Sequence, residues 1–306
     1  MKVSLLLFCS LIAAVAGASA QLDLYREERR DRLPAFENLE TTGGVDVIEL
    51  NDQGIKLALS SKFDEASRAF REVVGLAPLS AMAHYNLGNS LYNLGKYDEA
   101  VEHLNFAVQI QPDYFKPHLV LGQAYYRIGD FEKSVSELRR AAELEPNDAL
   151  TLNDLAVAYY RLNDLKKALE SVDAALKLKP DLASALNNRG TFLCGMGKYK
   201  DAVKSFDQAI ALDPKFAEPH NNRGTALAAL GKKKEAHKSY LEAVRLRPTW
   251  DYALYNLAVS YLALNLREEA RKPYYTLKGI NPELAEKFEK QFYQGYVVEA
   301  SETGFE

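Results

Sequence analysis

Apolar, small and polar residues recur along this chain with a period of 34 residues, beginning at position 47. Within each period, positions 4, 7, 8 and 11 follow one helical face, and positions 20, 24 and 27 follow a second. Side chains spaced by three and four residues share one side of a helix, so the pattern predicts two amphipathic helices per repeat. A turn is expected near position 15, which is glycine in four repeats: Gly95, Gly129, Gly197 and Gly231.

Proline stands at position 32 of all seven repeats, at Pro78, Pro112, Pro146, Pro180, Pro214, Pro248 and Pro282. With a background of about 5% proline, chance would give this register odds on the order of 10⁻⁹. Proline is expected to end the second helix, because inside a helix it costs about 3 kcal/mol. Small residues at positions 8 and 20 allow the paired helices to approach closely, and a bulky side chain there should cost about 1–3 kcal/mol.

One stretch, AHYNLGNSLYNLGKYDEAVEHLNFAVQIQPD from Ala83 to Asp113, joins these features. It resembles the tetratricopeptide repeat pattern. The likeness covers residues 47–284 in seven repeats, at 47–80, 81–114, 115–148, 149–182, 183–216, 217–250 and 251–284. The resemblance implies an all-α fold, an α-solenoid in which seven helix-turn-helix repeats form a right-handed superhelix. It also implies that the first helices of the repeats line a concave groove.

The C-terminal end of the array departs from the pattern. Pro273, at position 23 of the last repeat, predicts a kink or a late start of that second helix. Apolar residues then recur every four residues, at Leu284, Phe288, Phe292 and Tyr296. They predict a capping helix over residues 285–298, followed by a short acidic tail at 299–306.

The first twenty residues, MKVSLLLFCSLIAAVAGASA, combine one lysine, a short apolar run and an A-x-A site. This order predicts a secretory signal peptide at residues 1–20, cleaved before Gln21, and hence a periplasmic or secreted protein. The run is shorter than the roughly 20 residues of a membrane span, so no stable span is expected in the mature chain. Cleavage leaves Cys194 as the only cysteine, so no internal disulfide is expected. The charged segment and linker at 21–46 have two possible interpretations, a helix folded onto the first repeat and a solvated arm, and the sequence does not decide between them.

Charge and histidine placement narrow the function classes. With 38 basic and 42 acidic residues, the chain has no broad positive field, and nucleic acid is not an expected partner. His84, His118 and His220 fall at position 4, where the family often packs an aromatic residue, and His103 and His237 lie on second helices of different repeats. Because none shows metal-ligand spacing, we expect no metal site, no other cofactor and no enzymatic activity.

Positions 2, 5, 6, 9, 12 and 13 of the first helix remain after the packing faces are assigned, and they are expected to face the groove. Polar residues there include Asn86, Asn89, Gln123, Asn153, Asp154, Asn187, Asn188, Thr191, Asn221, Asn222, Thr225 and Asn256. Asparagine is about 0.6 kcal/mol worse than alanine in a helix, so its repetition needs a reason. Solubility or side-chain bonds between repeats are one explanation, and ligand recognition by amide donors and acceptors is the other. The resemblance favours the second, since superhelical members of the family hold an extended peptide with a similar asparagine ladder.

A second series at positions 12 and 13 is aromatic and cationic: Tyr92, Tyr126, Arg127, Tyr160 and Arg161. Such side chains suit aromatic or acidic peptide groups and equally sugar rings, while packing of the tyrosines between repeats is the alternative. Arg189 and Arg223, each within a copy of the stretch NNRG, stand where the family usually has leucine. Their stems are expected to cover apolar surface while the guanidinium groups reach water.

Together these residues predict an exported scaffold or adaptor that binds an extended polypeptide segment of a protein partner in its groove and assists assembly of a complex. The alternative is a carbohydrate-binding protein of an envelope or extracellular polysaccharide pathway, with a glycan stacked on the tyrosines. A purely structural spacer is a third interpretation.

Overall fold

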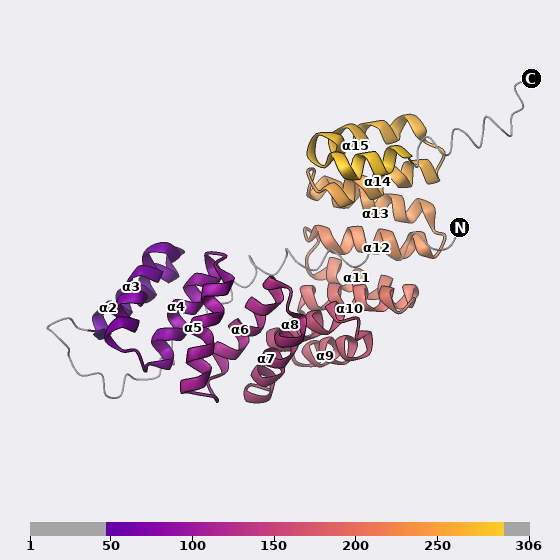
Figure 1. The fold of residues 1–306 in the computed structure, drawn as a ribbon. Helices are drawn as coiled ribbons and strands as arrows, with labels where there is room; N and C mark the ends of the chain where they lie inside the picture. Colours follow the sequence, from indigo (N-terminus) through magenta and orange to yellow (C-terminus); the bar gives the residue numbers. More distant parts are fainter. Residues whose placement is uncertain (1–46, 291–306) are drawn as a thin grey trace, which may run out of the picture. The chain divides into compact units, whose positions relative to one another are not determined.

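The computed structural model describes residues 47–290, which form helices joined by short turns and, over this range, contain no strand (Figure 1). They divide into two compact parts, called here the N-terminal block, up to Pro180, and the C-terminal block, from Asp181. The predicted signal peptide, linker and tail, and the capping helix beyond position 290, lie outside the described residues.

The N-terminal block contains four helix pairs. Its first helices are α2 (Val47–Leu59), α4 (Ala81–Asn93), α6 (Phe115–Ile128) and α8 (Ala149–Arg161). Its second helices are α3 (Phe63–Leu76), α5 (Tyr97–Ile110), α7 (Phe131–Leu144) and α9 (Leu165–Leu178). Each first helix packs against its own second helix, and α3, α5 and α7 also pack against the next first helix. The buried core therefore continues from one repeat to the next.

The C-terminal block contains three pairs built in the same way. They are α10 (Ala183–Gly195) with α11 (Tyr199–Leu212), α12 (Ala217–Ala229) with α13 (Lys233–Leu246), and α14 (Asp251–Ala263) with α15 (Arg267–Ile280). All first helices of both blocks begin at the first residue of a 34-residue repeat. The predicted all-α solenoid of helix pairs is confirmed.

The turn inside each pair requires a left-handed residue at position 15. The four glycines there have φ between 73° and 96°. The three other repeats place Ser61, Asn163 and Asn265 at the same position, each with φ of 60°. Asparagine tolerates this conformation better than most residues, and serine has no such advantage. The turn geometry is thus a property of the helix pair, and glycine is the least costly way to reach it.

The two ends of the described array differ from its interior. In α4, positions 3, 6, 7 and 10 are buried as Ala83, Asn86, Leu87 and Ser90. In α2, the same positions are exposed as Glu49, Asp52, Gln53 and Lys56. A polar outer side is typical of a terminal repeat. At the other end, residues 282–290 are helical, and Leu284, Ala285 and Phe288 pack onto the core of α14 and α15.

The last repeat tolerates a proline inside its second helix. The helix α15 runs through Pro273 and begins at position 17, like the other second helices, so a late start is excluded, while a kink at the proline stays a prediction. Ala270 and Leu277, three residues before and four after the proline, are fully buried in the core of this repeat. Their packing offsets the backbone hydrogen bond that the proline cannot donate.

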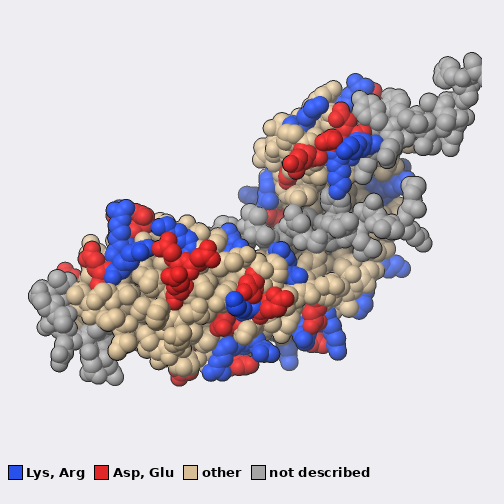
Figure 2. Space-filling model, viewed as in Figure 1, with Lys and Arg blue, Asp and Glu red and all other residues tan. Residues whose placement is uncertain are grey.

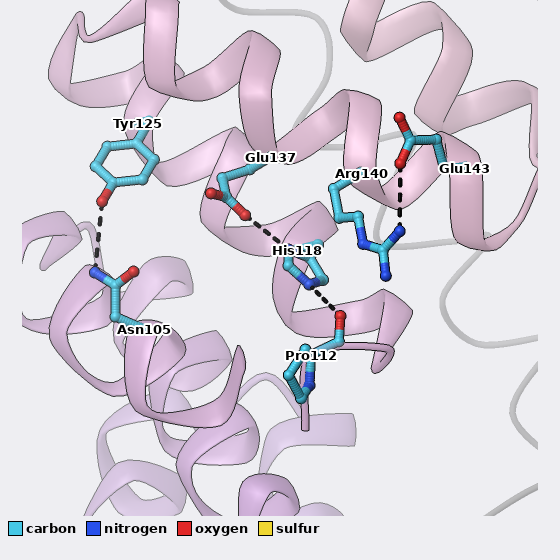
Figure 3. A network of polar contacts seen from close by, with 7 residues as sticks. All are labelled: Asn105, Pro112, His118, Tyr125, Glu137, Arg140 and Glu143. Atoms are coloured by element: carbon cyan, nitrogen blue, oxygen red, sulfur yellow. Dashed lines mark hydrogen bonds and ion pairs between the residues drawn. The ribbon is translucent and has the colours of Figure 1, made fainter. Parts of the chain in front are cut away.

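Histidines at position 4 tie a repeat to the loop that precedes it. The Nε2 atoms of His84, His118 and His220 lie 3.0, 3.0 and 3.1 Å from the carbonyl oxygens of Pro78, Pro112 and Pro214, respectively. In His84 and His118, the other ring nitrogen faces the side chain at position 23 of the repeat, on the second helix. Nδ1 lies 3.1 Å from His103 Nδ1 in one repeat and 2.7 Å from Glu137 Oε2 in the next (Figure 3). The position-4 histidines are therefore bonded within the fold.

Acidification should weaken the N-terminal block through His103. Burial, followed by His84 and Arg71, lowers the pKa of His103 from its ordinary value of 6.5, against the opposing effect of Glu102 and Glu99. The unfolded chain therefore takes up this proton more readily than the folded chain. The stability contributed by the neutral ring should be full above about pH 6.5 and be lost as the pH falls below it.

The measurement is amide hydrogen exchange of α4 and α5 between pH 7.5 and pH 5.5, corrected for intrinsic exchange. Protection should fall in the wild type and fall less in His103→Gln. Burial also lowers the pKa of His237 in the C-terminal block, so the reading must come from α4 and α5 and not from global unfolding. An equal loss of protection in both proteins would contradict the assignment.

Candidate partner-binding surface on the first helices

Amides at positions 5 and 6 bond to each other between neighbouring repeats. Asn86 Nδ2 donates to Asn51 Oδ1 at 2.9 Å in the N-terminal block. In the C-terminal block, Asn222 Nδ2 donates to Asn187 Oδ1 at 3.0 Å, and Asn256 Nδ2 donates to Asn221 Oδ1 at 2.9 Å. In each case the donor at position 6 follows the acceptor at position 5 of the preceding repeat by 35 residues. We call these bonds the amide ladder.

The amide ladder is largely closed to solvent. Asn51 and Asn221 are 1% and 0% exposed, and Asn86, Asn187 and Asn222 are also buried. Of the explanations left open by the sequence, side-chain bonding between repeats holds for these members, since their bonds join one repeat to the next. Among them, Asn256 is the one that is half-buried. Partner contact by the ladder amides stays a prediction.

Two threonines of the stripe bond to the backbone of their own helices. Thr191 and Thr225 donate their hydroxyls to the carbonyl oxygens of Asn187 and Asn221, one turn earlier in the same helices. Asn153 and Asn188 are buried, whereas Asn89 is half-buried. The hydroxyls of these threonines are therefore satisfied within their own helices.

The arginines of the two NNRG copies connect the two helices of their own repeat. Arg189 donates to Ser205 Oγ at 2.9 Å, and Arg223 donates to Ser239 Oγ at 2.8 Å. Arg223 also pairs with Asp207 at 2.6 Å, on the second helix of the preceding repeat. Their guanidinium groups are thus bonded to second helices, and the covering of apolar surface by their stems stays a prediction.

Three consecutive repeats of the N-terminal block bring together a tyrosine, an amide and a carboxylate. Gln123 Nε2 donates to Asp154 Oδ2 at 2.7 Å. The pKa of Tyr92 is raised to about 12, chiefly by burial and then by the carboxylate of Asp154, while Arg127 acts in the opposite direction. Gln123 of α6 and Asp154 of α8 are thus in direct contact, and the Asp154 carboxylate is close enough to Tyr92 of α4 to raise its pKa. The half-buried Tyr126 and Tyr160 belong to the same series.

Aromatic rings hold the two arginines of this series. The guanidinium carbon of Arg127 lies 5.1 Å from the ring centroid of Tyr97. That of Arg161 lies 4.2 Å from the ring centroid of Phe131 and 5.4 Å from that of Tyr126, and Arg161 also donates to the Tyr126 hydroxyl at 3.2 Å. Cation–π contacts of this kind contribute about 0.5–1 kcal/mol at exposed sites. We call Tyr92, Gln123, Tyr126, Arg127, Asp154, Tyr160 and Arg161 the tyrosine–arginine row.

Charges elsewhere are mixed. Basic and acidic side chains are interspersed on the face of the molecule in Figure 2. Several pair within one helix, such as Lys204 with Asp201 and Arg245 with Glu242.

Among the described residues, no group of three His, Cys, Asp or Glu side chains is arranged to hold a metal ion. None of the described helices has both the length and the apolar character needed to cross a bilayer.

Family models match most of the repeat array. A model described as TPR repeat matches residues 88–129 and 193–231, and models described as Tetratricopeptide repeat match 119–183, 217–250 and 252–283. The chain belongs to the tetratricopeptide repeat family. No curated protein sequence matches it significantly.

Solved tetratricopeptide repeat structures are similar in fold. The APC/C hetero-tetramer Cut9–Hcn1 shares 18% identity at a TM-score of 0.66, over 80% of this chain and 48% of that one, so this chain spans about half its length. A tetratricopeptide repeat protein from Parabacteroides merdae shares 16% identity at a TM-score of 0.66, over 81% of this chain and 98% of that one. YrrB is described as a TPR protein with an unusual peptide-binding site. It shares 18% identity at a TM-score of 0.52, over 62% of this chain and 97% of that one. At these identities the likeness shows the fold alone.

Sequence reasoning missed the aromatic residues that orient the arginines. Tyr97 and Phe131 stand at position 17, the first residue of a second helix, and were not among the predicted groove residues. Each precedes its arginine by 30 residues, since Arg127 and Arg161 stand at position 13 of the following tetratricopeptide repeat. This recurring aromatic–arginine spacing was the available sequence signal.

Proposed function

We propose that this chain is an exported tetratricopeptide repeat scaffold that binds an extended polypeptide segment of a partner protein and assists assembly of a complex. The tyrosine–arginine row carries the proposal. Its side chains come from successive first helices, and its aromatic and cationic members remain partly or fully exposed. The leader-like sequence of residues 1–20 supports export.

The spacing of the row suits an extended chain. Packed helices lie roughly 8–10 Å apart, and an extended peptide advances about 3.3 Å per residue, so one repeat corresponds to about three peptide residues. The half-buried apolar side chains of Ile55, Met82 and Leu119 belong to the same stripe of the first helices. They would offer apolar contacts beside the polar groups. The peptide-binding site named for YrrB supports the proposal as a precedent within the same fold.

The test uses protein recovered from the exported fraction of cells, whose mass should correspond to residues 21–306. A randomised peptide display should yield enriched peptides, and their affinities are then measured by fluorescence anisotropy. Tyr126→Ala combined with Tyr160→Ala should weaken binding by about tenfold or more, since aromatic anchors commonly carry over 1 kcal/mol each.

The matched control is Tyr275→Ala, which removes a tyrosine that is 64% exposed on the second helix α15. It should leave binding unchanged, and all variants should keep wild-type helicity by circular dichroism. Absence of enriched peptides, or equal weakening by the control, would reject the proposal. Displacement by soluble oligosaccharides and not by peptides would support the carbohydrate-binding alternative instead.

A further inference from the structure

Arg127 and Arg161 form a repeated pair of oriented cations. Both are exposed, both stand at position 13 of a first helix, and adjacent repeats supply them. Each is held by the position-17 aromatic ring of the preceding repeat, Tyr97 or Phe131. The same arrangement therefore occurs twice, offset by one repeat.

Aromatic contact prepares a guanidinium group to bind a carboxylate. When the plane of the group lies against a ring, its N–H donors point outward along its edge and can form two parallel bonds to one carboxylate. Tyr126 fixes one end of the Arg161 group by accepting a hydrogen bond at 3.2 Å. By contrast, Arg71, Arg223 and Arg247 are paired with Glu99, Asp207 and Glu218 of the fold itself.

Asp154, the acidic residue of the row, interacts with other members of the row. Asp154 accepts a hydrogen bond from Gln123 and raises the pKa of the Tyr92 phenol. Asp154 is therefore engaged within the row, while the two arginines would contact the side chains of the peptide.

We propose that the N-terminal block selects extended peptides carrying two carboxylate side chains about three residues apart, one for each arginine. The spacing follows from one repeat per arginine, at roughly 10 Å between packed helices and about 3.3 Å per peptide residue. This inference rests on the proposed function, because it names the chemical class of the peptide bound at the same row.

The probes are labelled twelve-residue peptides in an alanine and serine background, measured by fluorescence anisotropy. One carries two glutamates three residues apart, a second carries two glutamines there, and a third has the glutamates adjacent. The spaced glutamate peptide should bind about tenfold or more tightly than the glutamine peptide, and its affinity should fall with added salt. Equal affinities for the three peptides would overturn the inference.

Arg127→Gln combined with Arg161→Gln should remove the preference for glutamate, so that the spaced glutamate peptide and the glutamine peptide bind the variant about equally. Arg68→Gln combined with Arg139→Gln is the control, because it makes the same charge change at exposed positions on second helices. Loss of the preference in the control would overturn the inference, since a general field would then explain it. If display-selected peptides bind at the row but the spaced glutamate peptide shows no preference, the inference fails and the proposed function stands. If no peptide binds at the row, both fail.

Discussion

Replacing Asn221 by alanine is expected to destabilise the C-terminal block by about 2 kcal/mol. Asn221 is 0% exposed, accepts from Asn256 Nδ2 at 2.9 Å, and donates to Asn222 Oδ1 at 3.4 Å. Removing one partner from a buried hydrogen bond leaves the other unsatisfied, at a cost of about 1–3 kcal/mol. This cost should outweigh the gain of about 0.6 kcal/mol in helix propensity.

Repeat arrays do not always unfold in two states, so the loss should be measured locally, by hydrogen exchange of α12 and α14 in the full chain. Asn256→Ala is the matched variant. It breaks the same bond from its half-buried end and leaves the buried Asn221 Oδ1 without this donor, so it should also be destabilising, by about 1–3 kcal/mol. A purely ligand-binding role for the ladder predicts no loss of stability in either variant. Unchanged protection in Asn221→Ala would therefore contradict the structural role assigned to the amide ladder.

The helix pairs could be predicted because their determinants are local and repeat with the chain. Proline at position 32 and a turn residue at position 15 act within a few residues of themselves, and the small residue at position 8 packs against position 24 of the same repeat. First helices consequently begin at the register positions, from Val47 to Asp251. Ser61, Asn163 and Asn265 show the limit of reading by residue type, because the left-handed turn occurs there without glycine.

The role of the amide ladder could not be read from a period of 34. Stacking brings position 5 of one repeat beside position 6 of the next, so bonded residues are 35 apart in sequence. One-repeat periodicity places all amides in one stripe and does not show which of them touch. In the same way, the position-17 rings lie on a different helix from the arginines they hold, and only the packing of successive pairs brings them together.

Replacing Gly122 by alanine should destabilise the N-terminal block, by about 1–3 kcal/mol from overpacking. A Cβ atom at this position would lie 2.6 Å from Leu138 Cγ and 3.1 Å from the Leu138 backbone nitrogen. Alanine gains up to about 1 kcal/mol in helix propensity over glycine, so the net loss measures how little the packing can adjust. Position 8 thus faces position 24 of the same repeat.

In repeat four, a larger residue at position 8 is matched by a smaller residue at position 24. There, position 8 is Ala156 and position 24 is Val172, and both are fully buried. Leu138→Val should therefore rescue Gly122→Ala, with a coupling free energy of about 1 kcal/mol in a double-mutant cycle. Hydrogen exchange of α6 and α7 provides the four stabilities. Leu138→Val alone should be destabilising, by about 0.5–1.5 kcal/mol, because it leaves a small cavity against glycine. Additive effects of the two substitutions would show that the paired helices adjust their separation instead of matching residue size across it.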